Sequence, residues 1–113
     1  MFNAKIQRGE FHDMAKKYDG VIEAVRYHNG QIQVVRAFER RGAAFSDRVM
    51  IERHELLKRL KEGRKFVTGK RKEGFGGMFE QGQPVQVVSR DGKDFISTRS
   101  DASQDVLEQV PVF

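Results

Sequence analysis

The sequence predicts a small α+β domain: a single antiparallel sheet of about five strands, with two helices packed on one face. Two observations support this prediction. The dipeptides Asn29-Gly30 and Asp91-Gly92 are typical of two-residue hairpin loops, and two segments space their apolar residues as helices do. A chain of 113 residues has the usual length of one domain, so we expect residues 1–113 to form a single globular unit.

Residues 21–39 hold the strongest structural signal. Asn29-Gly30 favours a type I′ turn, because both of its positions require positive φ. Folding the flanks about this turn places eight side chains on one face, in the pairs Tyr27 with Ile32, Val25 with Val34, Glu23 with Arg36, and Val21 with Phe38. Three apolar pairs and one opposite-charge pair are typical of an antiparallel ladder, so we predict this register.

Two helices are expected from apolar spacing. The first spans residues 9–20 and the second spans Glu52 to Glu62, with Gly20 and Gly63 as their C-terminal stops. The inward faces would carry Phe11, Met14, Ala15 and Tyr18 in the first helix, and Leu56, Leu57 and Leu60 in the second. In the second helix Glu55 precedes Arg59 by four residues, which favours an ion pair along the helix.

The remaining strands are short. Residues 49–51 and 65–68 read as strands, and the hairpin at Asp91-Gly92 would pair Val88 with Phe95 and Val87 with Ile96. Residues 100–104 read as a polar linker to a C-terminal segment that begins near Val106.

Residues 69–83 have no apolar period. Five of these fifteen residues are Gly, and three consecutive residues are cationic. Structureless loops of this length are uncommon in compact domains unless they are functional or mobile. We therefore predict a long, Gly-rich, basic loop.

The net charge of +5 is unevenly distributed along the chain. Residues 1–83 carry 18 Lys and Arg against 11 acids, a balance of +7, whereas residues 84–113 have a balance of −2. Basic charge of this size attracts nucleic acid, acidic proteins or anionic lipid, and it also keeps small proteins soluble.

The composition excludes several kinds of site. The chain has no Cys, which rules out a disulfide framework, a thiolate metal site and a cysteine nucleophile. His12, His28 and His54 lack the spacing of metal ligands, and neither a phosphate loop nor a dinucleotide fingerprint surrounds Gly69. We expect no metal, no cofactor and no catalytic residue; an enzyme whose site is assembled from distant residues is a further alternative.

Targeting features are also missing from the sequence. The longest run of strongly apolar residues is three, and charged residues interrupt the first twenty positions. We expect a cytoplasmic protein that does not associate with membranes.

The candidate site is a basic cluster with an aromatic residue: Arg64, Lys65, Lys70, Arg71, Lys72 and Phe75. Cations neutralise phosphates, and an exposed aromatic ring stacks on unpaired bases. These residues favour a non-catalytic module that binds RNA or single-stranded DNA. The structural alternative makes Phe66 and Phe79 core residues and the charges a solvated rim.

The second functional alternative is a protein-interaction or assembly module. It rests on the nine Phe residues, on the Gly-rich loop bearing Met78 and Phe79, and on the apolar segment Val110 to Phe113. That segment docks either on its own core or on a partner.

Overall fold

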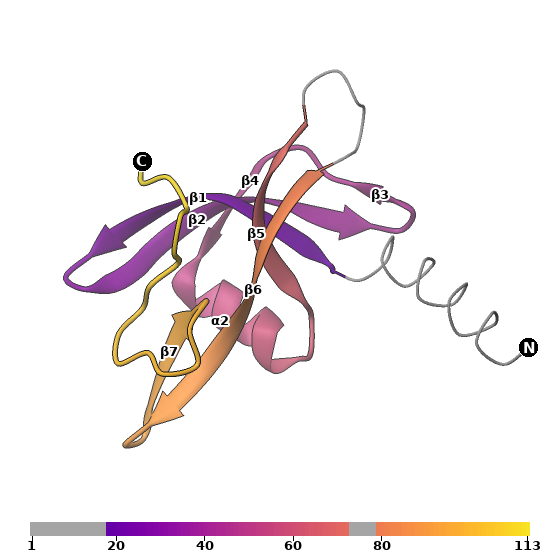
Figure 1. Cartoon of the computed structure of the whole chain (residues 1–113). Coiled ribbons are helices and arrows are strands. Elements are labelled where there is room, and N and C mark those ends of the chain that lie inside the picture. The colour runs from indigo at the N-terminus through magenta and orange to yellow at the C-terminus, as the bar shows by residue number, and fades with distance from the viewer. Residues whose placement is uncertain (1–17, 73–78) are drawn as a thin grey trace, which may run out of the picture.

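One curled sheet of seven strands and one helix make up the part of the chain that the structure, a computed structural model, describes: residues 18–72 and 79–113 (Figure 1). The strands lie in the order β3-β2-β1-β5-β6-β7, and β4 pairs with β2 off this path. The elements are β1 (Gly20–His28), β2 (Gln31–Arg41), β3 (Ala44–Phe45), β4 (Val49–Glu52), α2 (Arg53–Lys61), β5 (Phe66–Arg71), β6 (Phe79–Arg90) and β7 (Lys93–Ser97). Together they form a half-barrel of the α+β class, made mostly of strands.

The sheet is mixed, so the prediction of an antiparallel sheet of about five strands is wrong in direction and in number. β1 and β5 are parallel over three residue pairs, from Gly20 opposite Phe66 to Ile22 opposite Thr68. A parallel pair needs a long crossover connection, and here the connection runs through β2, β3, β4 and α2. Sequence patterns identify strands one at a time and do not reveal such a pairing.

The first hairpin forms where it was predicted. Asn29 and Gly30 have φ angles of 53° and 77°, and the outer pairs Tyr27–Ile32 and Val21–Phe38 are confirmed. The two central pairs are wrong: the structure pairs Val25 with Val35, and Arg36 with Ala24. One bulge in each strand causes the difference. Glu23 is an extra residue in β1 that shifts the register by one, and Gln33 is an extra residue in β2 that restores it.

These bulges decide which side chains enter the core. A regular strand alternates its faces, but the extra residue at Glu23 lets Ile22 and Val25 share one face. Both belong to the main core cluster. Val21 and Phe38 lie in a second cluster with Val67. The sheet therefore buries apolar residues on both faces of β1.

The predicted second helix is confirmed as α2, which packs against β2, β4 and β6 and lies between the two hairpins (Figure 1). Leu56 is buried, and Gly63 takes a φ of 93° after the helix. The expected Glu55–Arg59 pair is not formed. Instead, Glu55 accepts a hydrogen bond from the backbone N–H of Glu52 (3.4 Å) at the start of the helix. This contact is part of a capping box, in which the side chain of the third helical residue bonds to the backbone of the N-cap residue.

The predicted first helix, over 9–20, falls largely on residues 1–17, outside the described residues. Gly20 belongs to β1 and does not close a helix. Within the described part of the chain there is therefore one helix where two were expected over the whole chain. That part contains no helix that could serve as a membrane span.

The prediction of a loop over 69–83 is wrong at both ends. β5 continues to Arg71 and β6 begins at Phe79, so the glycines at 69 and 82 lie in paired strands. A Cβ at Gly69 would overlap the Glu80 carbonyl oxygen, and one at Gly82 would overlap the Thr68 hydroxyl. Glycine here permits a close approach of two backbones at a register shift. Residues 73–78 lie outside the described residues.

The second hairpin is confirmed. Asp91 and Gly92 have φ angles of 53° and 76° at its tip. The predicted pairs form in β6 and β7: Val88 with Phe95, and Val87 with Ile96.

The C-terminal segment docks on the domain itself. Val110 is buried in the main core, and the backbones of Pro111 and Phe113 bond to both the N–H and the carbonyl of Val25 (2.9 and 3.0 Å). Ala102 is also buried, so residues 100–104 are not a free polar linker. This segment extends the sheet beyond the point where β5 leaves β1.

Asp105 anchors this segment inside the domain. Its carboxylate accepts hydrogen bonds from the backbone N–H groups of Ile32 (2.8 Å) and Ile96 (2.9 Å). It also accepts two from the Arg53 guanidinium, at 2.7 and 3.1 Å. The Asp105 side chain is fully buried, while that of Arg53 is 21% exposed. The hydrogen bond to Asp105 is the main cause that raises the pKa of Arg53.

Replacing Asp105 should therefore destabilise the fold. Asp105→Asn keeps the size but removes the charge and one acceptor oxygen, which leaves Arg53 without its ion-pair partner. We therefore expect a loss of about 3 kcal/mol or more in the free energy of unfolding. Denaturant melts measure it. Asp101→Asn, on an exposed carboxylate of the same segment, is the matched control and should leave the melt nearly unchanged. Equal melts for the two variants would contradict this role.

Candidate anion-binding site

The structure separates the predicted basic cluster into two groups. Arg64 and Lys65 precede β5, whereas Lys70 and Arg71 lie at its far end, followed by Lys72. Six residues of extended chain span about 20 Å, so one small ligand cannot contact both groups. Phe75 lies outside the described residues.

At the far end of β5, Arg71 is not a solvated loop cation. Its guanidinium carbon lies 4.6 Å from the centre of the Phe38 ring and 5.8 Å from that of Phe79. Its Nε is buried and has no hydrogen-bond acceptor among the described residues. Lys70 lies 3.6 Å from the Glu80 carboxylate, and both side chains are exposed. This end therefore presents fewer available cations than the sequence suggests.

At the other end, Arg64 lies with three arginines that no pattern in the sequence indicates as a site. Arg40, Arg41, Arg59 and Arg64 line, together with Glu39, an open pocket of about 420 Å³. We call it the arginine pocket. The end of β2 supplies residues 39–41, α2 supplies Arg59, and the turn after α2 supplies Arg64.

Two of these guanidinium groups are held in place by the fold. Arg59 donates to the Glu39 carboxylate at 2.7 and 3.4 Å, and the Glu39 side chain is only 8% exposed. Arg40 lies over the Phe45 ring (4.6 Å to its centre) and donates from Nε to the Tyr18 carbonyl oxygen (3.1 Å). Such contacts reduce the entropy lost when an anion binds.

The other two guanidinium groups are available. Arg41 is exposed and Arg64 is partly exposed, and neither makes an ion pair with a described residue. Four cations against one carboxylate give the described lining a formal charge of +3. Because guanidinium groups donate paired N–H groups, this arrangement suits phosphate or carboxylate oxygens.

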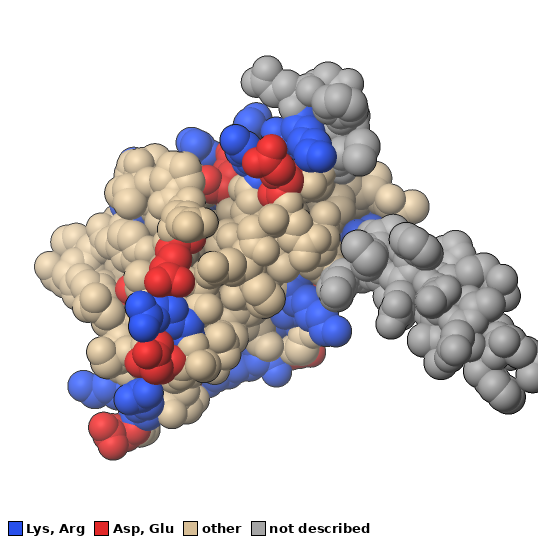
Figure 2. Space-filling view, in the orientation of Figure 1, with Lys and Arg blue, Asp and Glu red and all other residues tan. Residues whose placement is uncertain are grey.

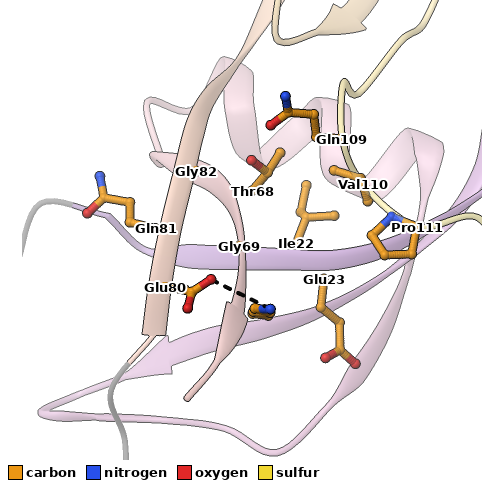
Figure 3. Close-up of a pocket in the computed structure, with 11 residues that line it drawn as sticks. Ile22, Glu23, Thr68, Gly69, Glu80, Gln81, Gly82, Gln109, Val110 and Pro111 are labelled. Atoms are coloured by element: carbon orange, nitrogen blue, oxygen red, sulfur yellow. Dashed lines mark ion pairs between the residues drawn. The ribbon is translucent and has the colours of Figure 1, made fainter.

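A second cavity, of about 400 Å³, lies where β5 and the C-terminal segment diverge from β1 (Figure 3). Its lining carries both signs of charge, and these charges are already compensated. Lys70 pairs with Glu80, and Glu23 accepts hydrogen bonds from Arg36 (2.8 Å) and Arg48 (2.6 Å). The cavity therefore offers no uncompensated charge to a ligand.

The charges on the face of the molecule that Figure 2 shows are mixed. Figure 2 shows basic and acidic side chains interleaved over the face seen in Figure 1, with no broad patch of one sign. Among the described residues, no group of three or more His, Asp or Glu side chains could hold a metal ion. The arginine pocket is thus the described feature with the clearest chemistry.

Sequence reasoning missed Arg40, Arg41 and Arg59. The adjacent pair Arg40-Arg41 directly follows the hairpin predicted over residues 21–39, and its position alone indicates no site. No local pattern connects that pair to Arg59 and Arg64, which approach it only through the packing of α2 on β2.

Comparison of the chain with protein-family models, with curated proteins and with solved structures finds no match.

The arginine pocket predicts specific stabilisation by phosphate. A ligand that binds only the folded state raises its stability, so inorganic phosphate should raise Tm by about 2–4 °C over chloride at equal ionic strength. Differential scanning calorimetry measures the shift. Arg41→Gln with Arg64→Gln should abolish the difference, and an undiminished difference in that variant would place the bound phosphate elsewhere.

Proposed function

We propose that this domain is a non-catalytic module that binds single-stranded nucleic acid, RNA or DNA, through the arginine pocket. The observation that carries this proposal is the convergence of Arg40, Arg41, Arg59 and Arg64 around one open pocket whose only described carboxylate, Glu39, is already bound. Phosphodiester groups supply the repeated anions that such a pocket fits.

The choice of phosphate over other anions follows from geometry and from charge. Guanidinium groups bind phosphate oxygens through paired hydrogen bonds, and arginine is the preferred residue for nucleic-acid backbones. The net charge of +5 adds a long-range attraction for a polyanion.

The composition of the pocket supports binding over catalysis. Its described lining has no hydroxyl or imidazole group, and the Glu39 carboxylate is bound to Arg59. A general base needs a free lone pair within reach of the substrate's proton. The lone pairs of Glu39 are instead occupied by the hydrogen bonds from Arg59.

The other predicted residues enter as a second contact. Lys70 and Lys72, at the far end of β5, would bind the backbone of strands long enough to extend about 20 Å beyond the pocket. Stacking of a base on Phe75 belongs to the same part of the proposal.

Salt dependence tests the proposal directly. Binding of a single-stranded oligonucleotide should weaken with salt, with a log–log slope of about −0.7 for each phosphate neutralised. Arg41→Gln with Arg64→Gln should flatten the slope by about 1.4, because two phosphate contacts are lost. Fluorescence anisotropy over a salt series gives the slopes.

The matched control is Arg90→Gln with Lys93→Gln, which removes the same charge from exposed positions in the second hairpin. Its slope should equal that of the unmodified protein. Equal flattening in the two variants would indicate a diffuse attraction with no specific pocket. Competition by polyglutamate at the same charge concentration as the oligonucleotide would favour an acidic protein as the partner instead.

A further inference from the structure

A groove of about 500 Å³ lies beside the arginine pocket, between the end of α2 and strands β5 and β6. Apolar side chains form most of its wall, among them Leu60, Val67, Pro84 and Val87. Gln81 and Gln86 also line it, and both are exposed on β6. An apolar wall with a few polar groups is typical of a small-ligand site, and this volume lies in the range of such sites.

The groove and the arginine pocket are adjacent, because they share one lining residue. Arg64 lines both cavities. Lys61 and Lys65 also line the groove, whose described lining contains no acidic residue. Lys61 is compensated by Asp94 at 2.5 Å, a hydrogen bond that is the main cause lowering the pKa of Asp94. The uncompensated cations of the groove are therefore Arg64 and Lys65, next to the proposed phosphate site.

We infer that the groove holds a nucleobase of the strand whose phosphate lies in the arginine pocket; this inference rests on the proposed function. The base lies against the apolar wall, and the amide groups of Gln81 and Gln86 bond to its edge. Unstacked bases of single strands are recognised in this way, by apolar contact and by hydrogen bonds to their edges. An amide suits this role because it both donates and accepts.

The dimensions favour a base over a peptide helix. A volume of about 500 Å³ admits one planar group with its sugar, whereas a helix needs a longer apolar surface to bury several side chains. The charge favours an anionic occupant, because Arg64 and Lys65 are the uncompensated cations of the groove. An anionic ligand with an apolar, hydrogen-bonding group fits both properties.

The test compares two strands of equal length, polyuridine and a sugar–phosphate strand without bases, for binding to the whole protein. The unmodified protein should bind polyuridine at least about tenfold more tightly, because one base docked in the groove contributes about that factor and a base stacked on Phe75 would add to it. In the double variant Gln81→Ala with Gln86→Ala, the ratio of the two affinities should fall at least about threefold. The salt slope of this variant should stay unchanged, because an amide group releases no counterions. The control, Gln33→Ala with Gln83→Ala, changes two exposed strand glutamines outside the groove and should keep the ratio.

The outcomes separate this inference from the proposed function. A ratio near one in the unmodified protein, with a normal salt slope, would overturn the groove and leave the arginine pocket intact. A ratio that both variants keep, or that both lose equally, would place the base elsewhere and overturn the inference. Absence of binding to either strand would overturn both proposals. Circular dichroism verifies that each variant is folded, which the exposure of all four glutamines leads us to expect.

Discussion

The buried carboxylate of Asp105 is the interaction on which the rest of the arrangement depends. One side chain from the C-terminal segment bonds to β2, to β7 and to the first residue of α2, three elements far apart in the sequence. A buried charge is tolerated only when it is paired and hydrogen-bonded, and here two backbone amides and a guanidinium group meet that need. Because Arg53 begins α2, the same contact fixes where the helix starts on the sheet.

A second ion pair fixes the far end of the helix. Arg59 lies six residues after Arg53, about 9 Å along the axis, and bonds to Glu39 on β2. The helix is thus held to the sheet near both ends by partly buried charges. The second attachment differs in its surroundings, because Arg40, Arg41 and Arg64 gather beside it. The Arg59–Glu39 ion pair holds one wall of the arginine pocket in place, and the groove shares Arg64 with that pocket.

The sequence predicted those features that neighbouring residues decide. The turns at Asn29-Gly30 and Asp91-Gly92 and the bounds of α2 depend on a few adjacent positions, so local chemistry was sufficient. The bulge at Glu23 depends on which faces of β1 pack against apolar residues, and distant segments decide that. The parallel pairing of β1 with β5 depends on the entire connection between these two strands. Glu23 still bonds to Arg36 as expected, although the backbone partner of Arg36 is Ala24. The arginine pocket was only partly predicted, through Arg64, because its other members come from distant segments.

The arginine side chains themselves report most directly whether phosphate binds in the arginine pocket. Nuclear magnetic resonance of the Nε–Hε groups, recorded while a single-stranded oligonucleotide is added, reports which guanidinium groups meet phosphate. Binding of phosphate in the arginine pocket predicts saturable shifts at Arg41 and Arg64, with smaller shifts at Arg40 and Arg59, which are already engaged. Arg90 and Arg99 should not move. Shifts concentrated at Arg90 and Arg99, or spread equally over all exposed arginines, would contradict it.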